Sequence, residues 1–185
     1  MGELVKSAHL GGLLLCVSIV NLTLAVLPYW VHVDSYSDIG VFTSLRSGSQ
    51  MLITTQCDYA MEEIECGYVK AMQICTVVTI LFGFCGAVVY FSPPRSFNNL
   101  QTFLAQVCSS CSFVFALMNT VLLAYFKVDY FDDDGINRED DDIGASNVHY
   151  EFCYWLWVAT TVATFLIMTT GYFYIYRVRY MKNIL

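Results

Sequence analysis

The sequence predicts a membrane protein of the all-α class, in which four spanning helices carry a small antiparallel β-sheet outside the bilayer. Two observations predict this fold class. Hydrophobic residues make up 57% of the 185 residues and charged residues only 14%, which is too apolar for a soluble domain of this length. The apolar residues also gather into four long runs, separated by one long and strand-like polar segment and by shorter connections.

The four runs contain no Asp, Glu, Lys or Arg over at least 20 residues each. About 20 apolar residues of helix cross the hydrocarbon core of a bilayer, so each run predicts one span. We interpret the first run as an uncleaved span, because it is too long for the apolar region of a signal peptide. The chain is then a single four-span domain, residues 1–185, with predicted spans at Leu10–Tyr29, Met72–Phe91, Phe103–Phe126 and Tyr154–Tyr176.

The distribution of charge predicts the orientation of these spans. The segments 1–9, 92–102 and 177–185 together carry a net charge of +4, whereas the loops 30–71 and 127–153 carry −11. Lys and Arg concentrate in cytosolic segments of membrane proteins. We therefore expect both termini in the cytosol, with the two long loops outside a plasma membrane, where disulfides are permitted.

The first outer loop is rich in residues that favour strands. Pieces of this kind are Trp30–Asp34, Val41–Leu45, Met51–Gln56 and Ile64–Tyr68, with a turn signal at 46–49. Cys57 follows the third piece and Cys66 lies in the fourth. Because antiparallel neighbours can bring two such residues within bonding distance, we predict a Cys57–Cys66 disulfide that staples the sheet.

Small and polar residues inside the runs indicate how the helices pack. Small residues that recur every three or four positions allow helix backbones to approach closely in lipid. Such residues are Gly83 and Ala87 in the second run, Ala105, Ser109, Ser112 and Ala116 in the third, and Ala159 and Ala163 in the fourth. The uncharged polar residues Asn21, Gln73, Gln106 and Asn119 are expected to face neighbouring helices.

This combination of features resembles the claudin superfamily, which includes claudins, peripheral myelin protein and the tetraspan auxiliary subunits of channels and receptors. Trp30 after the first span and the pair Cys57 and Cys66 match the family pattern. Gly40-Val41-Phe42 is similar to its Gly-Leu-Trp element, although Leu45 stands where the pattern has a cysteine. The chain is thus identified as a divergent member.

The resemblance implies a left-handed four-helix bundle with an outer sheet of four or five strands, and it places Trp30 at the base of that sheet. An alternative for Trp30 is an aromatic anchor at the membrane interface, a role that also suits Trp155 and Trp157.

The second outer loop is strongly acidic and is a candidate interaction surface. Its carboxylates include Asp132, Asp133, Asp134, Asp140, Asp141 and Asp142. Asp132, Asp134 and Asp141 are weak candidates for calcium ligands, because alignment on Gly135 puts Tyr130 at the first position of a calcium loop. We interpret the loop as a solvated acidic surface, and weak calcium binding by its clustered carboxylates is the alternative.

The sequence predicts no enzyme and no cofactor. His9, His32 and His149 lack the spacing of metal ligands, and no basic run suggests nucleic acid. Two functions remain open: a claudin-like protein of cell junctions that binds copies of itself, or an auxiliary subunit that binds the pore subunit of a channel or receptor. A one-chain transporter is disfavoured, because its spans would need ionisable residues.

Overall fold

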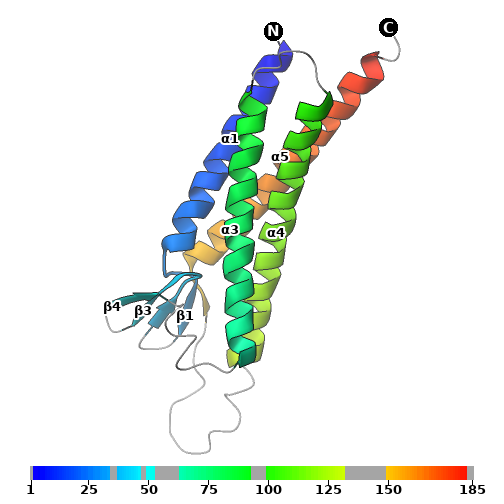
Figure 1. Ribbon diagram of the computed structural model, residues 1–185. Helices are drawn as coiled ribbons and strands as arrows, with labels where there is room; N and C mark the ends of the chain where they lie inside the picture. The colour runs from blue at the N-terminus through cyan, green and yellow to red at the C-terminus, as the bar shows by residue number, and fades with distance from the viewer. Residues whose placement is uncertain are drawn as a thin grey trace, which may run out of the picture.

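Four long helices make up most of the protein. We describe a computed structural model, which places residues 2–33, 37–46, 49–52, 63–92, 99–131 and 149–182. The helices are α1 (Gly2–Val26), α3 (Glu63–Phe91), α4 (Asn99–Phe131) and α5 (Phe152–Lys182). They run alternately up and down in the order α1, α3, α4, α5, and α5 also packs against α1 (Figure 1). The beginning of α1 and the end of α5 lie at one end of the bundle, which we call the terminal end.

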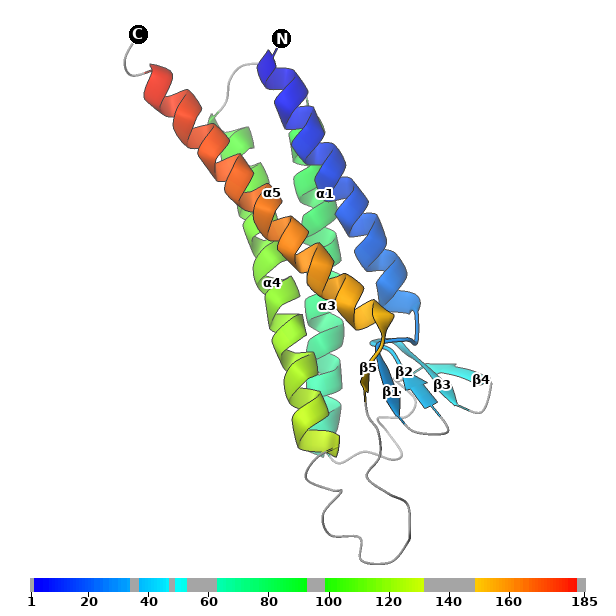
Figure 2. The same ribbon diagram turned by 180° about the vertical axis from the view of Figure 1, so that it is seen from behind.

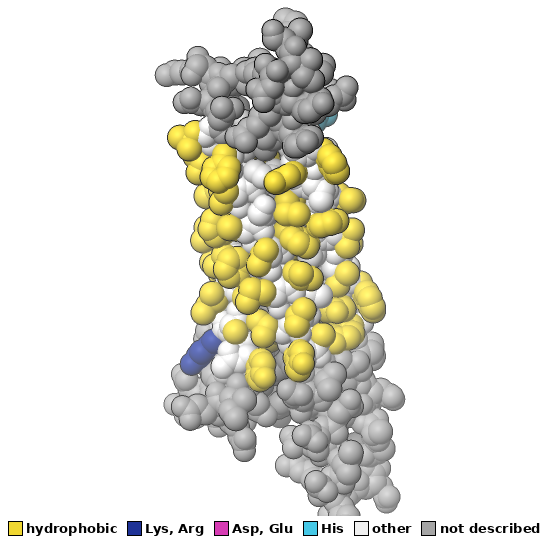
Figure 3. All heavy atoms as spheres, turned by 90° about the vertical axis from the view of Figure 1, so that its right-hand side faces the viewer, with side chains coloured by type: hydrophobic (Ala, Val, Ile, Leu, Met, Phe, Trp, Pro, Cys, Tyr) yellow, Lys and Arg dark blue, Asp and Glu magenta, His cyan; other side chains and the backbone are white. Residues whose placement is uncertain are grey.

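All four helices are long and apolar enough to cross a membrane, as the sequence predicts. The apolar stretches are Ala8–Val26, Gly67–Phe91, Leu100–Tyr125 and Phe152–Phe173. Large hydrophobic side chains face outward along every helix, among them Leu22, Leu81, Leu117 and Phe165. On the face drawn in Figure 3, hydrophobic side chains form a broad apolar band across the middle of the molecule. A surface of this kind is compatible with contact to lipid tails, and we conclude that the protein is a multi-pass membrane protein.

Helix α1 ends earlier than its apolar run. The run continues to Tyr29, but the helix stops at Val26, two residues before Pro28. A proline disfavours helical geometry in the residue that precedes it, here Leu27. The chain therefore turns out of the helix while it is still apolar, and Trp30 and Val31 are buried immediately after the turn.

Five short strands pair at the other end of the bundle, which we call the sheet end (Figure 1). Their order is β4-β3-β2-β1-β5, and each pairing is antiparallel. Arg46 pairs with Ser49, as the predicted turn at 46–49 requires. The strands are β1 (Val31–Val33), β2 (Ser37–Ile39), β3 (Thr43–Arg46), β4 (Ser49–Leu52) and β5 (His149–Tyr150).

The fourth predicted strand, Ile64–Tyr68, is wrong, because these residues form the first turns of α3. One physical reason favours the helix. Val69 and Met72 are both buried and lie three residues apart, which is the spacing of one helix face. Cys66 therefore lies on a helix, so two adjacent strands cannot supply the predicted disulfide geometry. Cys57 lies outside the described residues, and its pairing with Cys66 stays a prediction.

The small face predicted on α4 is confirmed. Ala105, Ser109, Ser112 and Ala116 are all buried, and the hydroxyl of Ser112 donates to the carbonyl of Thr79 on α3 at 3.0 Å. Gly83 and Ala87 are buried opposite them on α3. The expected packing of Ala159 and Ala163 against a helix of the bundle is wrong, because Ala159 is exposed.

Helix α5 instead buries a face of hydroxyl residues next to a tryptophan. These residues are Trp157, Thr160, Thr161 and Thr164. The hydroxyls of Thr161 and Thr164 each donate to a carbonyl four residues earlier on their own helix, which satisfies them locally. The methyl groups then remain for packing, so a run of threonines can replace small residues at a helix interface.

Three of the four polar residues within the spans bond to a neighbouring helix, as predicted. Asn21 on α1 accepts a hydrogen bond from Thr160 on α5 at 2.6 Å. Asn119 on α4 donates to Thr76 on α3 at 3.0 Å. Gln106 on α4 donates to the carbonyl of Met168 on α5 at 2.8 Å. The fourth, Gln73, bonds to the sheet segment and not to a helix.

We predict that Gly83→Ala destabilises the bundle. A methyl group at this position would collide with the side chain of Ser18 on α1. Overpacking of this kind costs about 1–3 kcal/mol, which thermal unfolding in detergent measures as a lower melting temperature. Gly12→Ala is the matched control, since its methyl group would meet only the ring edge of Phe91 at 3.9 Å. Equal melting temperatures for both variants would refute the close approach at Gly83.

Candidate functional site

The candidate site is the junction that fixes the sheet to the bundle, and we call it the sheet root. We define it as Trp30, Val31, Gly40, Val41, Gln73 and Trp157. Its residues come from the turn after α1, the first strand, the β2–β3 segment, α3 and α5, so residues that are distant in sequence meet there. The surrounding apolar cluster also contains Leu24, Val69, Met72, Leu123 and Cys153.

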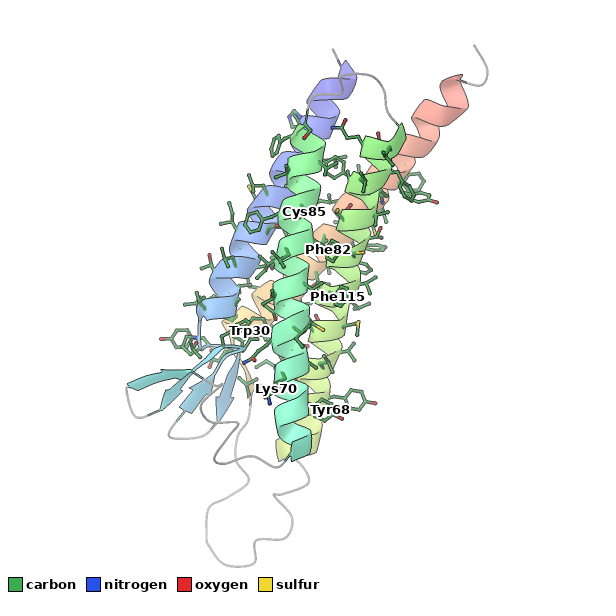
Figure 4. All side chains as sticks on the ribbon, in the orientation of Figure 1. Trp30, Tyr68, Lys70, Phe82, Cys85 and Phe115 are labelled. Atoms are coloured by element: carbon green, nitrogen blue, oxygen red, sulfur yellow. The ribbon has the colours of Figure 1, made fainter. Side chains whose placement is uncertain are left out.

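Trp30 is at the centre of the sheet root. Its side chain is only 1% exposed, and its ring lies 5.2 Å from the ring of Trp157, centroid to centroid, at a tilt of 48°. Trp30 lies where the bundle meets the sheet (Figure 4). Its indole nitrogen donates to the carbonyl of Leu24 at 2.8 Å, in the last turn of α1. Trp30 therefore packs the core and also supplies a side-chain donor to a carbonyl at the end of the helix.

The sheet segment satisfies a second carbonyl at the end of α1. The hydroxyl of Thr43, the first residue of β3, donates to the carbonyl of Val26 at 3.1 Å. The chain turns directly after the helix, and the amide of Leu27 donates to the carbonyl of Leu24 at 3.2 Å. The last turn of α1 is thus capped by residues from the strands that follow it.

The start of α5 is joined to the same place through its backbone. The amide of Glu151 donates to the carbonyl of Trp30 at 3.0 Å, and the amide of Cys153 donates to Tyr29 at 3.2 Å. Strand β5 continues this contact, because Tyr150 pairs with Val31. The short β5 therefore links the first helix, the sheet and the last helix.

Gly40 allows the sheet to approach α1 closely. A Cβ atom at this position would collide with the carbonyl oxygen of Leu27, and it would lie 2.8 Å from Pro28 Cα and from the oxygen of Thr43. The amide of Gly40 donates to that same Thr43 oxygen at 2.8 Å. Glycine is required here for space. Half-buried Phe42, two residues on, packs against the same apolar cluster.

Gln73 connects α3 to the sheet segment. Its side-chain amide donates to the carbonyl of buried Val41 at 3.1 Å. Lys70 lies nearly one turn earlier on α3, and it is exposed at the sheet end of the bundle (Figure 4). The sheet therefore contacts the side of α3, a contact that the sequence did not reveal because Gln73 follows an ordinary apolar helix pattern.

Trp157 is not an interfacial anchor, which corrects one interpretation from the sequence. It is fully buried, and its indole nitrogen donates to the carbonyl of Ala116 on α4 at 3.3 Å. Trp155 is 60% exposed and meets the ring of Tyr154 edge to face at 5.3 Å. Trp155 therefore keeps the exposure that an anchor requires.

Tyr150, in strand β5, contacts the rings of Tyr154 and Trp155 at the start of α5. Its ring stacks on Tyr154 at 4.0 Å between centroids. Burial, reinforced by the nearby hydroxyl of Tyr154, raises the pKa of Tyr150 above its ordinary value. The hydroxyl is therefore neutral throughout the physiological pH range.

The described residues of the sheet root contact one another through packing and hydrogen bonds. Within the described part of the chain, no three His, Cys, Asp or Glu residues gather as metal ligands would. Six cysteines whose side chains are described are free thiols: Cys16, Cys75, Cys85, Cys108, Cys111 and Cys153. The acidic residues Asp132, Asp133, Asp134, Asp140, Asp141 and Asp142 lie outside the described residues, so their roles as calcium ligands or interaction surface stay predictions.

Comparison of the sequence with known protein families and with curated proteins gives no match to either.

We predict that Trp30→Phe destabilises the protein more than Trp155→Phe does. The first change removes the donor to Leu24 and leaves a gap beside Trp157, whereas the second trims an exposed ring. Losing the bond alone costs about 1 kcal/mol, while exposed substitutions usually fall within about 0.5 kcal/mol. Thermal unfolding in detergent compares the two. If Trp155→Phe were the more damaging change, the sheet root would not be the structural centre described here.

Proposed function

We propose that the protein is a non-enzymatic, claudin-like membrane protein whose sheet binds other proteins outside the cell. The observation that supports this proposal is the attachment of the sheet. Val31 and Val41 are buried in the apolar cluster at the sheet end of the bundle, so the sheet shares its core with the helices. A sheet held in this way presents its outer strands in a fixed direction relative to the membrane.

The position of the sheet fits a binding surface. It extends sideways from below α1, and β4 is its outermost strand (Figures 1 and 2). The edge of a sheet can pair with an extended segment of another protein through backbone hydrogen bonds. In this proposal the partner is a second copy of the chain, in the same membrane or in that of a neighbouring cell.

The charge of the chain supports the orientation that this function needs. The terminal end carries the basic segments, whereas the loops that join at the sheet end carry most of the carboxylates. The sheet then faces outward from the plasma membrane, and both termini lie in the cytosol. A disulfide between Cys57 and Cys66 belongs to the same proposal, because it requires the oxidising outer compartment.

A second function is supported by the outward face of α5. Ala159 is exposed there, one turn from partly buried Ala163, and small residues let another helix approach closely in lipid. This face would suit an auxiliary subunit that packs against the pore subunit of a channel or receptor. The acidic loop would then contact the partner outside the membrane.

Tagged copies of the chain distinguish these functions. Two differently tagged copies are expressed in one cell population, and separately in two populations that are then cultured together. We expect recovery of one tag with the other after mild detergent extraction in both arrangements, because the sheet binds copies within and between membranes. Recovery of a channel or receptor subunit without the second tag would support the auxiliary role.

Two variants assign the surface that carries the binding. Asn substitutions at Asp132–Asp134 and Asp140–Asp142 remove charge from the acidic loop, and Ala159→Leu blocks the small face of α5. Junction binding through the sheet should survive Ala159→Leu. If the protein reaches the cell surface and yet brings down neither a second copy of itself nor a channel or receptor subunit, that result would contradict the proposed function in both forms.

A further inference from the structure

We propose that Gln106 and Gly171 form a latch between α4 and α5 that fixes the position of the terminal half of α5. This inference is independent of the proposed function. It concerns the helix that continues directly from the sheet, because α5 begins two residues after β5. A contact that fixes the angle of α5 at the terminal end therefore acts on the same helix that is attached to the sheet at its other end.

Helix α5 diverges from its neighbour toward the terminal end. The helices α1 and α5 lie close together near the sheet, and their opposite ends are well apart in both views (Figures 1 and 2). Past Gly171, Tyr172 and Phe173 are strongly exposed, with Phe173 at 74%. Contacts near Gly171 therefore determine where the last described part of α5 lies.

Gln106 and Gly171 are in close contact at this position. Gln106 is 7% exposed, and its side-chain amide donates to the carbonyl of Met168, one turn before Gly171. A Cβ atom on Gly171 would lie 2.7 Å from Gln106 Oε1 and 2.7 Å from the hydroxyl of Tyr90 on α3. No side chain other than hydrogen fits between α5 and these two groups without moving them.

The same contact accounts for an unusual acceptor. Gln106 Oε1 is buried, and no N–H or O–H group in the described structure donates to it. Because a Cβ on Gly171 would point at this oxygen, the hydrogen on Gly171 Cα occupies that direction. Weak Cα–H···O contacts recur between packed helices, and such a contact gives an acceptor oxygen a partner where no N–H or O–H group is available. Gln106 thus holds α5 with both ends of its amide group.

Apolar contact alone does not provide an equivalent attachment. Among the described residues, Ile167 is the one member that α5 contributes to the buried cluster at the terminal end, and the ring of Phe165 on α5 lies 5.2 Å from the ring of Phe113 on α4. Apolar side chains gain little from leaving lipid for a helix interface, so close packing and hydrogen bonds determine which helices associate. The hydrogen bond of Gln106 to Met168 therefore adds a directional attachment that these apolar contacts of α5 do not supply.

The sheet half of α5 is held by different residues. Trp157 bonds to Ala116 on α4, Thr160 bonds to Asn21 on α1, and the amide of Cys153 bonds to Tyr29. Release of the latch should therefore let the terminal half move away while the sheet half stays in place. Because the two halves of α5 are held by different residues, a distance measured at the sheet end serves as the control for a distance measured at the terminal end.

The test measures two distances in Gly171→Leu by electron–electron double resonance. Ketone-bearing amino acids carry the spin labels, so the native cysteines are not modified. One pair, at Leu100 and Phe173, reports the terminal end, and the other, at Tyr125 and Trp155, reports the sheet end; all four side chains are exposed. We expect the Leu100–Phe173 distance to increase by about 2 Å or more, the range over which packed-helix separations vary with the contacting side chains. The Tyr125–Trp155 distance should stay the same.

Matched controls separate the latch from general loosening. Gly67→Leu adds the same side chain on α3, where a Cβ would meet nothing within 4 Å, and it should change neither distance. An unchanged Leu100–Phe173 distance in Gly171→Leu, or an equal increase at both ends, would overturn the proposal.

A pair of smaller substitutions tests the latch if Gly171→Leu does not fold. Gly171→Ala should lower the melting temperature in the native background, because Gln106 cannot move without losing its bond to Met168. In the Gln106→Ala background the same change should have a smaller effect, because the obstructing amide is gone. Equal losses in both backgrounds would show that the two residues do not act together, and the latch would be refuted.

Discussion

The structure depends on how the last turn of α1 satisfies its backbone carbonyls. A carbonyl left without a donor in apolar surroundings costs several kcal/mol, and α1 ends at Val26, where the chain is still apolar. Trp30 and Thr43 supply donors to Leu24 and Val26 from the strand segment. Because Thr43 belongs to the sheet and Trp30 directly precedes its first strand, the sheet cannot move away from α1 without breaking both bonds; the Leu24 carbonyl would then keep only the amide of Leu27 as a donor, and the Val26 carbonyl would lose Thr43. Its position relative to the bundle follows from this constraint.

The features that could be predicted from the sequence are those with a long or periodic signal. Four uncharged runs predicted four spans, and a three- and four-residue repeat predicted the buried face of α4. Asn21, Gln106 and Asn119 were predicted to bond between helices, because an amide in lipid needs a partner. Each of these predictions depends only on residue type and spacing along one helix, so it can be made without knowing which segments pack against that helix.

The features that could not be predicted depend on contacts between distant segments. Ile64–Tyr68 has the composition of a strand, yet its helix is fixed by the buried face that continues through Met72. Strand β5 has only two residues, which is too short for any periodic signal. Of the sheet root, the sequence indicated Trp30 and Gly40 by resemblance. It also indicated Gln73, but the bond of Gln73 to the sheet segment is recognisable only once Val41 is placed beside it. The acidic loop lies outside the described residues.

Amide hydrogen exchange of the detergent-solubilised protein tests the central claim most directly. The claim is that the sheet and the helix ends around it form one structural unit. The amides of Gly40, Glu151 and Cys153 report it, because they bond to Thr43, Trp30 and Tyr29 respectively. We predict that all three exchange with the same free energy of opening. A Gly40 amide that opens far more easily than that of Cys153 would mean that the sheet moves independently of the bundle, and it would contradict the account.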